Sequence, residues 1–188
     1  MPRVILIVGV PGAGKSTVAR ALAARLERSA CIDGDVVQHG FTVSGLVGPG
    51  QQPAAESHRQ LELRWRNCAA LADNFFQEGF TVVVEHAASH RYWVDLFESH
   101  LRARPLSIVV LAPDPQVALA RDRARPEKQV AHLFGHMDAE LRANLARTGW
   151  WLDTSTLTVA ETVDAILERG ITAGEMPGPS PGPVAPTG

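Results

Sequence analysis

The chain has 188 residues, of which 45% are hydrophobic and 20% charged, and its formal net charge is −2. These values predict one globular domain with no overall electrostatic attraction to nucleic acid or to an anionic membrane. The apolar run near the first residue is too short for a signal peptide or a membrane span, and Cys31 and Cys68 lack metal-type spacing. We therefore expect a cytoplasmic protein with reduced thiols.

Apolar runs typical of buried strands alternate with helical patterns along the chain. Strands are predicted at residues 3–8, 30–32, 80–85, 106–112 and 150–153. Helices are predicted at residues 15–28, 54–79, 91–101, 114–124, 127–147 and 158–170. Because the strands are continuously apolar and helices separate them, the pattern favours a five-stranded parallel sheet with helices on both faces.

The end of the chain differs in composition from the rest. Residues 173–188 are rich in proline and glycine and lack the apolar side chains that a packed core needs. We therefore predict one domain over residues 1–172, followed by a disordered tail.

The first predicted strand leads into a glycine-rich turn and then a helix. The turn reads GVPGAGKS over residues 9–16 and matches the G-x-x-x-x-G-K-[ST] pattern. In this context the backbone N–H groups cradle phosphate oxygens, the lysine reaches the β- and γ-phosphates, and the serine hydroxyl holds Mg²⁺. The predicted nucleotide-binding residues are therefore Gly9, Val10, Pro11, Gly12, Ala13, Gly14, Lys15, Ser16 and Thr17.

Two carboxylates follow the second predicted strand, in the segment IDGD. Ligands of parallel sheets bind beyond the carboxyl ends of the strands, so Asp33 and Asp35 should face the phosphate loop. One carboxylate there can accept a proton from an attacking hydroxyl, and the other can orient substrate or a metal-bound water. A simple Asp-Gly turn is the alternative interpretation.

The segments GVPGAGKST and IDGD together resemble those of small P-loop kinases that act on metabolites. The segment DGDVVQHG resembles adenylylsulfate kinases and gluconate kinases, and the general layout resembles chloramphenicol phosphotransferase and the kinase domain of polynucleotide kinases. The last two resemblances imply that Asp35 is the catalytic base. The resemblance spans residues 3–170, although only these two segments are specific.

Several features depart from those families. The chain lacks the lysine-rich lid and the Phe-Thr-Gly-Ile segment of adenylylsulfate kinases, and VVQHGF replaces the His-Pro stretch of gluconate kinases. Relatives often end the third strand in Asp, where this chain has Glu85. Glu85 is predicted to bind Mg²⁺ through a water or to hold a substrate hydroxyl, so the base remains open between Asp33, Asp35 and Glu85.

A basic segment, ARDRARPEK, lies where small kinases carry a mobile lid, here at about residues 121–136. Arginines there stabilise the charge that develops during phosphoryl transfer. Arg121 and Arg125 share one helical face and are the predicted catalytic pair. A solvated basic helix face is the alternative interpretation.

The remaining candidates are placed by position. The resemblance implies that Thr154 and Ser155, after the fifth strand, line the adenine, although they also suit the capped start of a helix. His39 and His86 should line the substrate pocket, and Arg59 on the helix beside the cleft should hold the substrate. An exposed helix face is the alternative for Arg59.

Taken with the resemblance, the residues predict an α/β P-loop NTPase sandwich with an arginine-containing lid. The predicted activity is ATP- and Mg²⁺-dependent phosphorylation of a hydroxyl on a small molecule, by a monomer or homodimer. A polynucleotide 5′-hydroxyl kinase is one alternative, and the net charge of −2 argues against it. A nucleotide-binding switch or regulatory ATPase is the other.

Overall fold

The computed structural model describes residues 1–124 and 135–176. Its centre is one sheet of five parallel strands in the order β2-β3-β1-β4-β5. The strands are β1 (Val4–Gly9), β2 (Ser29–Asp33), β3 (Thr81–Ala87), β4 (Leu106–Leu111) and β5 (Trp150–Leu152). Every residue of β1 and β4 is buried, which explains their unbroken apolar sequences. The prediction of a five-stranded parallel sheet is confirmed.

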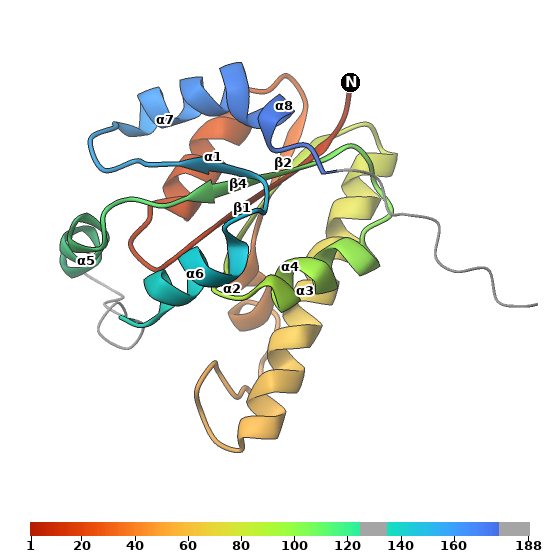
Figure 1. Cartoon of the computed structure of the whole chain (residues 1–188). Helices are drawn as coiled ribbons and strands as arrows, with labels where there is room; N and C mark the ends of the chain where they lie inside the picture. The colour runs from red at the N-terminus through yellow and green to blue at the C-terminus, as the bar shows by residue number, and fades with distance from the viewer. Residues whose placement is uncertain (125–134, 177–188) are drawn as a thin grey trace, which may run out of the picture.

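Helices cover both faces of this sheet (Figure 1). One face carries α1 (Lys15–Ala24), α7 (Val159–Ala165), the π-helical turn η2 (Ile166–Gly170) and α8 (Ile171–Ala173). The other face carries α3 (Ala54–Gln77), α4 (Arg91–His100) and α6 (Met137–Leu145). The short helices α2 (Gly34–His39) and α5 (Pro115–Arg123) follow β2 and β4. Among the described residues, no helix is long and apolar enough to cross a membrane.

The structure differs from the predicted elements in three main respects, apart from α1, which ends at Ala24 and not at residue 28. A short helix, α2, follows β2 where no helix was predicted, and the Asp33 side chain caps it by accepting from the N–H groups of Asp35 and Val36. The helix predicted at residues 127–147 is observed from Met137 to Leu145, and its first part lies outside the described residues.

The third difference concerns the expected tail, whose first four residues are ordered. Ala173 ends α8, the N–H of Ile108 donates to the Gly174 carbonyl at 2.7 Å, and the N–H of Met176 donates to the Leu106 carbonyl at 2.8 Å. Glu175 forms an antiparallel bridge with Ser107. The domain therefore extends along β4 at least to Met176, and the rest of the expected tail lies outside the described residues.

Candidate phosphotransfer site

The glycine-rich loop connects β1 to α1 and is shaped by close backbone packing. Gly12 and Gly14 have φ values of 81° and 89°, which favour glycine. A Cβ atom on Gly12 would lie 2.1 Å from the carbonyl oxygen of Ala118, so no side chain fits there. No side chain caps α1, whose first N–H groups and positive end are directed toward the loop. The loop is therefore built to bind an anion.

Lys15 begins α1, and its side chain is only 8% exposed. The Nζ atom donates to the backbone carbonyl of Val10 at 3.0 Å, within the same loop. The predicted lysine of the phosphate loop is thus folded over the cradle rather than extended into solvent. A phosphate in the loop could take the place of this carbonyl as a hydrogen-bond acceptor for the ammonium group.

Ser16 and Glu85 meet beside the loop. Glu85 reaches this place because the parallel register of β1 and β3 pairs it with Ile7, close to the carboxyl ends of both strands. The Ser16 hydroxyl donates to the Glu85 carboxylate at 2.7 Å. Burial raises the pKa of Glu85, while Lys15 and the hydrogen bond from Ser16 act in the opposite direction.

This pair fits a magnesium ion by the chemistry of its donor atoms. A hydroxyl and a carboxylate are the hard oxygen ligands that Mg²⁺ prefers, and Mg²⁺ needs only one or two protein ligands when phosphates and waters supply the others. The predicted metal residues, Ser16 and Glu85, therefore lie together. Among the described residues there is no cluster of three or more His, Cys, Asp or Glu side chains that could hold a metal without such help.

Asp33 and Asp35 take different roles in the structure. Asp33 caps α2 and pairs with Arg20 at 3.4 Å, and it does not line the cavity described below. Asp35 lies in the first turn of α2, where Nη1 of Arg64 from α3 donates to its carboxylate at 2.8 Å. The Arg64 side chain is 5% exposed, whereas that of Asp35 is 49% exposed. A buried cation thus holds a carboxylate that remains accessible.

The burial of Arg64 has an electrostatic consequence. Burial lowers the pKa of Arg64, and the nearby carboxylate of Asp35 is the largest opposing influence. An arginine so far from water requires a charged partner to remain favourable in the folded state. The pair therefore fixes Asp35 relative to α3.

His86 follows Glu85 and packs against α3. Its ring stacks on Trp65 with a centroid separation of 3.6 Å and an interplanar angle of 20°. His86 is 2% exposed, and its Nδ1 atom lies 2.9 Å from the carbonyl oxygen of Ala87. Burial first, and Arg64 second, hold the pKa of His86 well below its usual value. The ring is therefore neutral at physiological pH.

These side chains surround one cavity of about 440 Å³. It is lined by Pro11, Lys15, Ser16, Asp35, His39, Gly48, Pro49, Gln51, Leu61, Arg64, Glu85, His86, Ala87, Ser89, Trp93, His136 and Met137. Of the residues predicted to bind substrate, Asp35, His39, Glu85 and His86 line the cavity, and Asp33 and Arg59 do not. Arg59 pairs with Glu56, and its side chain is 72% exposed.

Arg64 is the cation that we did not select from the sequence. It follows Leu61 by three positions, precedes Cys68 by four, and lies next to Trp65, so it falls within the apolar stripe of α3. A charged residue inside a buried stripe was the available signal. Gln51, Trp93 and Met137 also line the cavity without having been predicted.

Arg121 and the loop after β5 also come together. The Arg121 guanidinium donates to the Thr154 carbonyl at 2.8 Å and to its hydroxyl at 3.4 Å. The Ser155 hydroxyl accepts from the N–H of Asp114 at 2.7 Å, at the start of α5. Three residues predicted to contact the nucleotide are thus neighbours, and Arg125 lies outside the described residues.

The strand order, the helices on both faces and the glycine-rich loop between β1 and α1 define an α/β P-loop kinase fold. A family model described as an AAA domain matches residues 4–147 of the sequence. The chain belongs to this AAA domain family. No curated protein matches the sequence significantly.

Solved structures share the fold at low sequence identity. A tunicamycin resistance protein from Deinococcus radiodurans is 20% identical, with a TM-score of 0.66 over 94% of this chain and 100% of that chain. A sugar kinase from Janibacter sp. HTCC2649 is 17% identical, with a TM-score of 0.62 over 92% and 94% of the two chains. A gluconokinase from Sinorhizobium meliloti 1021 is 20% identical, with a TM-score of 0.60 over 89% and 90%.

Proposed function

We propose that this protein transfers the γ-phosphate of ATP to a hydroxyl group of a small molecule. The observation that carries the proposal is the position of Asp35. Its half-exposed carboxylate is held at 2.8 Å by the buried Arg64 and lines the same cavity as Lys15 and Ser16. A nucleotide-binding switch needs no such carboxylate beside a cavity large enough for a second substrate.

In this proposal each side chain has one task. The acceptor oxygen attacks the γ-phosphorus, the bond from phosphorus to the β–γ bridging oxygen breaks, and ADP leaves. Asp35 accepts the proton of the attacking hydroxyl. Lys15 would bind the β- and γ-phosphates, and Ser16 and Glu85 would hold Mg²⁺. When bound, Mg²⁺ neutralises charge that develops on the phosphate oxygens.

The nucleotide end of the site is proposed to include residues away from the cavity. Arg121 is held by the Thr154 carbonyl, so α5 and the loop after β5 are linked where the base and the phosphates would pass. Arg121, together with the predicted Arg125, would stabilise the charge of the transferring phosphoryl group. Thr154 and Ser155 would line the base. Similarity to a sugar kinase and a gluconokinase supports the reaction class but not the acceptor.

The proposal is tested by replacing Asp35 with Asn. The wild-type protein is first screened with radiolabelled ATP against hydroxylated compounds, including short 5′-hydroxyl oligonucleotides. With the acceptor found, Asp35→Asn should retain ATP binding and lower phosphorylation by at least ~100-fold, because the amide cannot take the proton.

Asp164→Asn is the control for loss of an arginine-paired carboxylate outside the cavity, and its partner Arg25 is 54% exposed where Arg64 is 5% exposed. Asp164 is also paired with an arginine, and its side chain is 52% exposed, but it lies on α7 outside the cavity. This variant should keep the wild-type rate. An Asp35→Asn protein that phosphorylates at the wild-type rate would show that Asp35 is not the base, and Asp33 or Glu85 would become the candidate.

A further inference from the structure

The cavity is lined by chemically different side chains. Lys15, Ser16, Asp35 and Glu85 are charged or polar, and the lining also includes the polar residues His39, Gln51, Ser89 and His136. Apolar side chains from three separate elements and a loop form another part of the lining. These are Leu61 of α3, Trp93 of α4, Met137 of α6 and Pro49 of the loop before α3, which we call the far wall.

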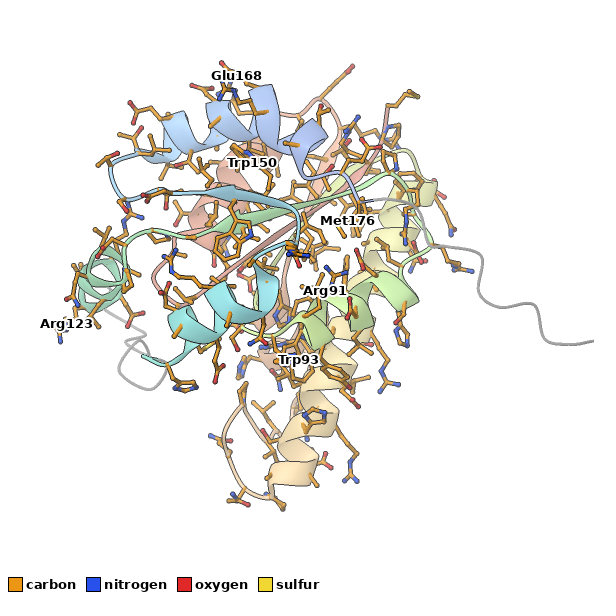
Figure 2. The ribbon with its side chains drawn as sticks, viewed as in Figure 1. Arg91, Trp93, Arg123, Trp150, Glu168 and Met176 are labelled. Carbon is orange, nitrogen blue, oxygen red and sulfur yellow. The ribbon has the colours of Figure 1, made fainter. Side chains whose placement is uncertain are left out.

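Trp93 is the largest side chain of the far wall, and its neighbours hold it in place. Its ring lies nearly parallel to that of Trp65, at 9° and 6.4 Å between centroids, and packs edge-on against Tyr92 at 4.9 Å. Figure 2 shows Trp93 where α4 meets α3, on the same face of the sheet as α6. A fixed aromatic surface of this kind suits a flat apolar group of a ligand.

The charges of the lining residues also favour an uncharged ligand. Among the described lining residues, only Lys15 and Arg64 carry a permanent positive charge at physiological pH. Lys15 belongs to the phosphate loop, and Arg64 is paired with Asp35 at 2.8 Å. The far wall itself contributes no charged side chain. A carboxylate or phosphate on the acceptor would therefore lose hydration there without gaining a counter-ion from the described residues of the far wall.

We propose that the acceptor is an uncharged alcohol whose body beyond the reacting hydroxyl is an apolar ring system. This inference rests on the phosphotransferase function proposed above. The hydroxyl lies at Asp35, and the ring lies against Trp93 and Leu61. Sugar acids, sugar phosphates and the 5′ ends of nucleic acids carry anionic groups that this wall does not match. They are the acceptor classes that the structure disfavours.

The proposal is tested with two acceptors that differ in one group. 4-Phenylbenzyl alcohol is compared with its analogue that carries a carboxylate at the far end of the biphenyl, with gluconate as a polyhydroxylated acid. We expect kcat/KM for the uncharged alcohol to exceed that for either acid by at least ~10-fold, the discrimination typical of a desolvated, unpaired charge. Binding to the complex with a non-hydrolysable ATP analogue is measured separately by calorimetry.

A pair of variants makes the test specific to the far wall. Leu61→Arg adds a cation to this wall, and we expect it to shift the kcat/KM ratio toward the carboxylated acceptor by at least ~10-fold. Leu63→Arg is the control, because Leu63 is on the same helix, is 47% exposed and does not line the cavity. It should leave the ratio unchanged. Melting temperatures of both variants verify that they fold.

The outcomes separate this inference from the proposed function. Phosphorylation of the acids at an equal or higher kcat/KM overturns the inference and leaves the phosphotransferase function intact. Binding of the uncharged alcohol that Leu61→Arg weakens, without phosphorylation of any acceptor, supports the ligand class and overturns the phosphotransferase function. Equal effects of Leu61→Arg and Leu63→Arg on the ratio also overturn the inference.

Discussion

Gly34 stands between the two aspartates, against the ring of His86. A Cβ atom at this position would lie 2.5 Å from Cδ2 and 3.0 Å from Nε2 of His86. The ring cannot yield easily, because it is buried and stacks on Trp65 with 3.6 Å between ring centroids. The absence of a side chain at Gly34 therefore sets how closely α2, and with it Asp35, approaches β3.

Gly34→Ala should disturb both stability and activity. We expect a loss of about 1–3 kcal/mol in the free energy of unfolding, the usual cost of overpacking, and a fall in kcat as Asp35 moves. Urea denaturation and acceptor kinetics measure the two effects. Gly135→Ala is the control, because no atom lies within 4 Å of its would-be Cβ. Equal stability of the two variants would contradict the packing argument.

Glu85 gives the site a pH dependence. Its ordinary pKa of 4.5 is raised in the folded protein, chiefly by burial. Burial disfavours the charged form of Glu85 in the folded state. The contribution of Glu85 to the free energy of unfolding is therefore fully present below pH 4.5, where the side chain is neutral, and is lost as the pH rises through the raised pKa.

Glu85→Gln should remove this pH dependence. Without nucleotide and metal, the melting temperature of the variant relative to wild type should increase as the pH rises above about 4.5. Parallel thermal melts between pH 4.5 and 8 provide the measurement. A difference that stays constant over this range would show that Glu85 is not destabilised by its burial.

At the scale of elements, α3 contacts α2, β3 and α4, which carry the residues of the proposed acceptor site. Two successive residues of this helix contact different elements. Arg64 pairs with Asp35 of α2, and Trp65 stacks on His86 of β3. Trp65 also contacts Trp93 of α4. The packing of one helix therefore positions the proposed base, the end of a strand and the far wall together.

On the nucleotide side, α5 is joined to the loop after β5 by Arg121 and Thr154. If Arg121 stabilises the transferring phosphoryl group, Arg121→Ala should lower kcat by ~10-fold or more and change the KM of the acceptor little. Arg123→Ala is the control, since Figure 2 shows Arg123 at the outer edge of α5. A similar kcat in both variants would favour the alternative interpretation, in which this segment is only a solvated basic helix face.

At the scale of the whole molecule, nucleotide binding should stabilise the fold. The phosphate loop packs against α5 at Gly12 and against β4 at Gly9. A ligand bound in the loop therefore stabilises the contacts between β1, β4 and α5. ATP with Mg²⁺ at about 100 times its Kd should add roughly 2.7 kcal/mol, or about 5–10 °C in melting temperature.

Lys15→Ala should abolish most of this shift while the free protein still folds. Differential scanning fluorimetry with and without ATP compares the two proteins, and circular dichroism verifies the fold of the variant. If wild type shows no shift at millimolar ATP, the phosphate loop does not bind the nucleotide as proposed.

Local patterns in the sequence were sufficient for the sheet and the phosphate loop. The apolar strands, the helical periodicity between them and the GVPGAGKS turn are short-range features, and each depends on the chemistry of a few neighbouring residues. The rule that ligands bind at the carboxyl ends of parallel strands then placed Asp35 and Glu85 beside the loop, where the structure has them.

The tertiary structure decided which polar side chains share the cavity. Arg59 and Arg64 are on the same helix, and only the packing of α3 against α2 and β3 buries Arg64 against Asp35 and leaves Arg59 exposed. Similarly, Trp93 and Met137 are 44 positions apart and line one cavity because α4 and α6 lie on the same face of the sheet. Contacts between residues distant in sequence depend on the relative orientation of whole elements, which local periodicity does not encode.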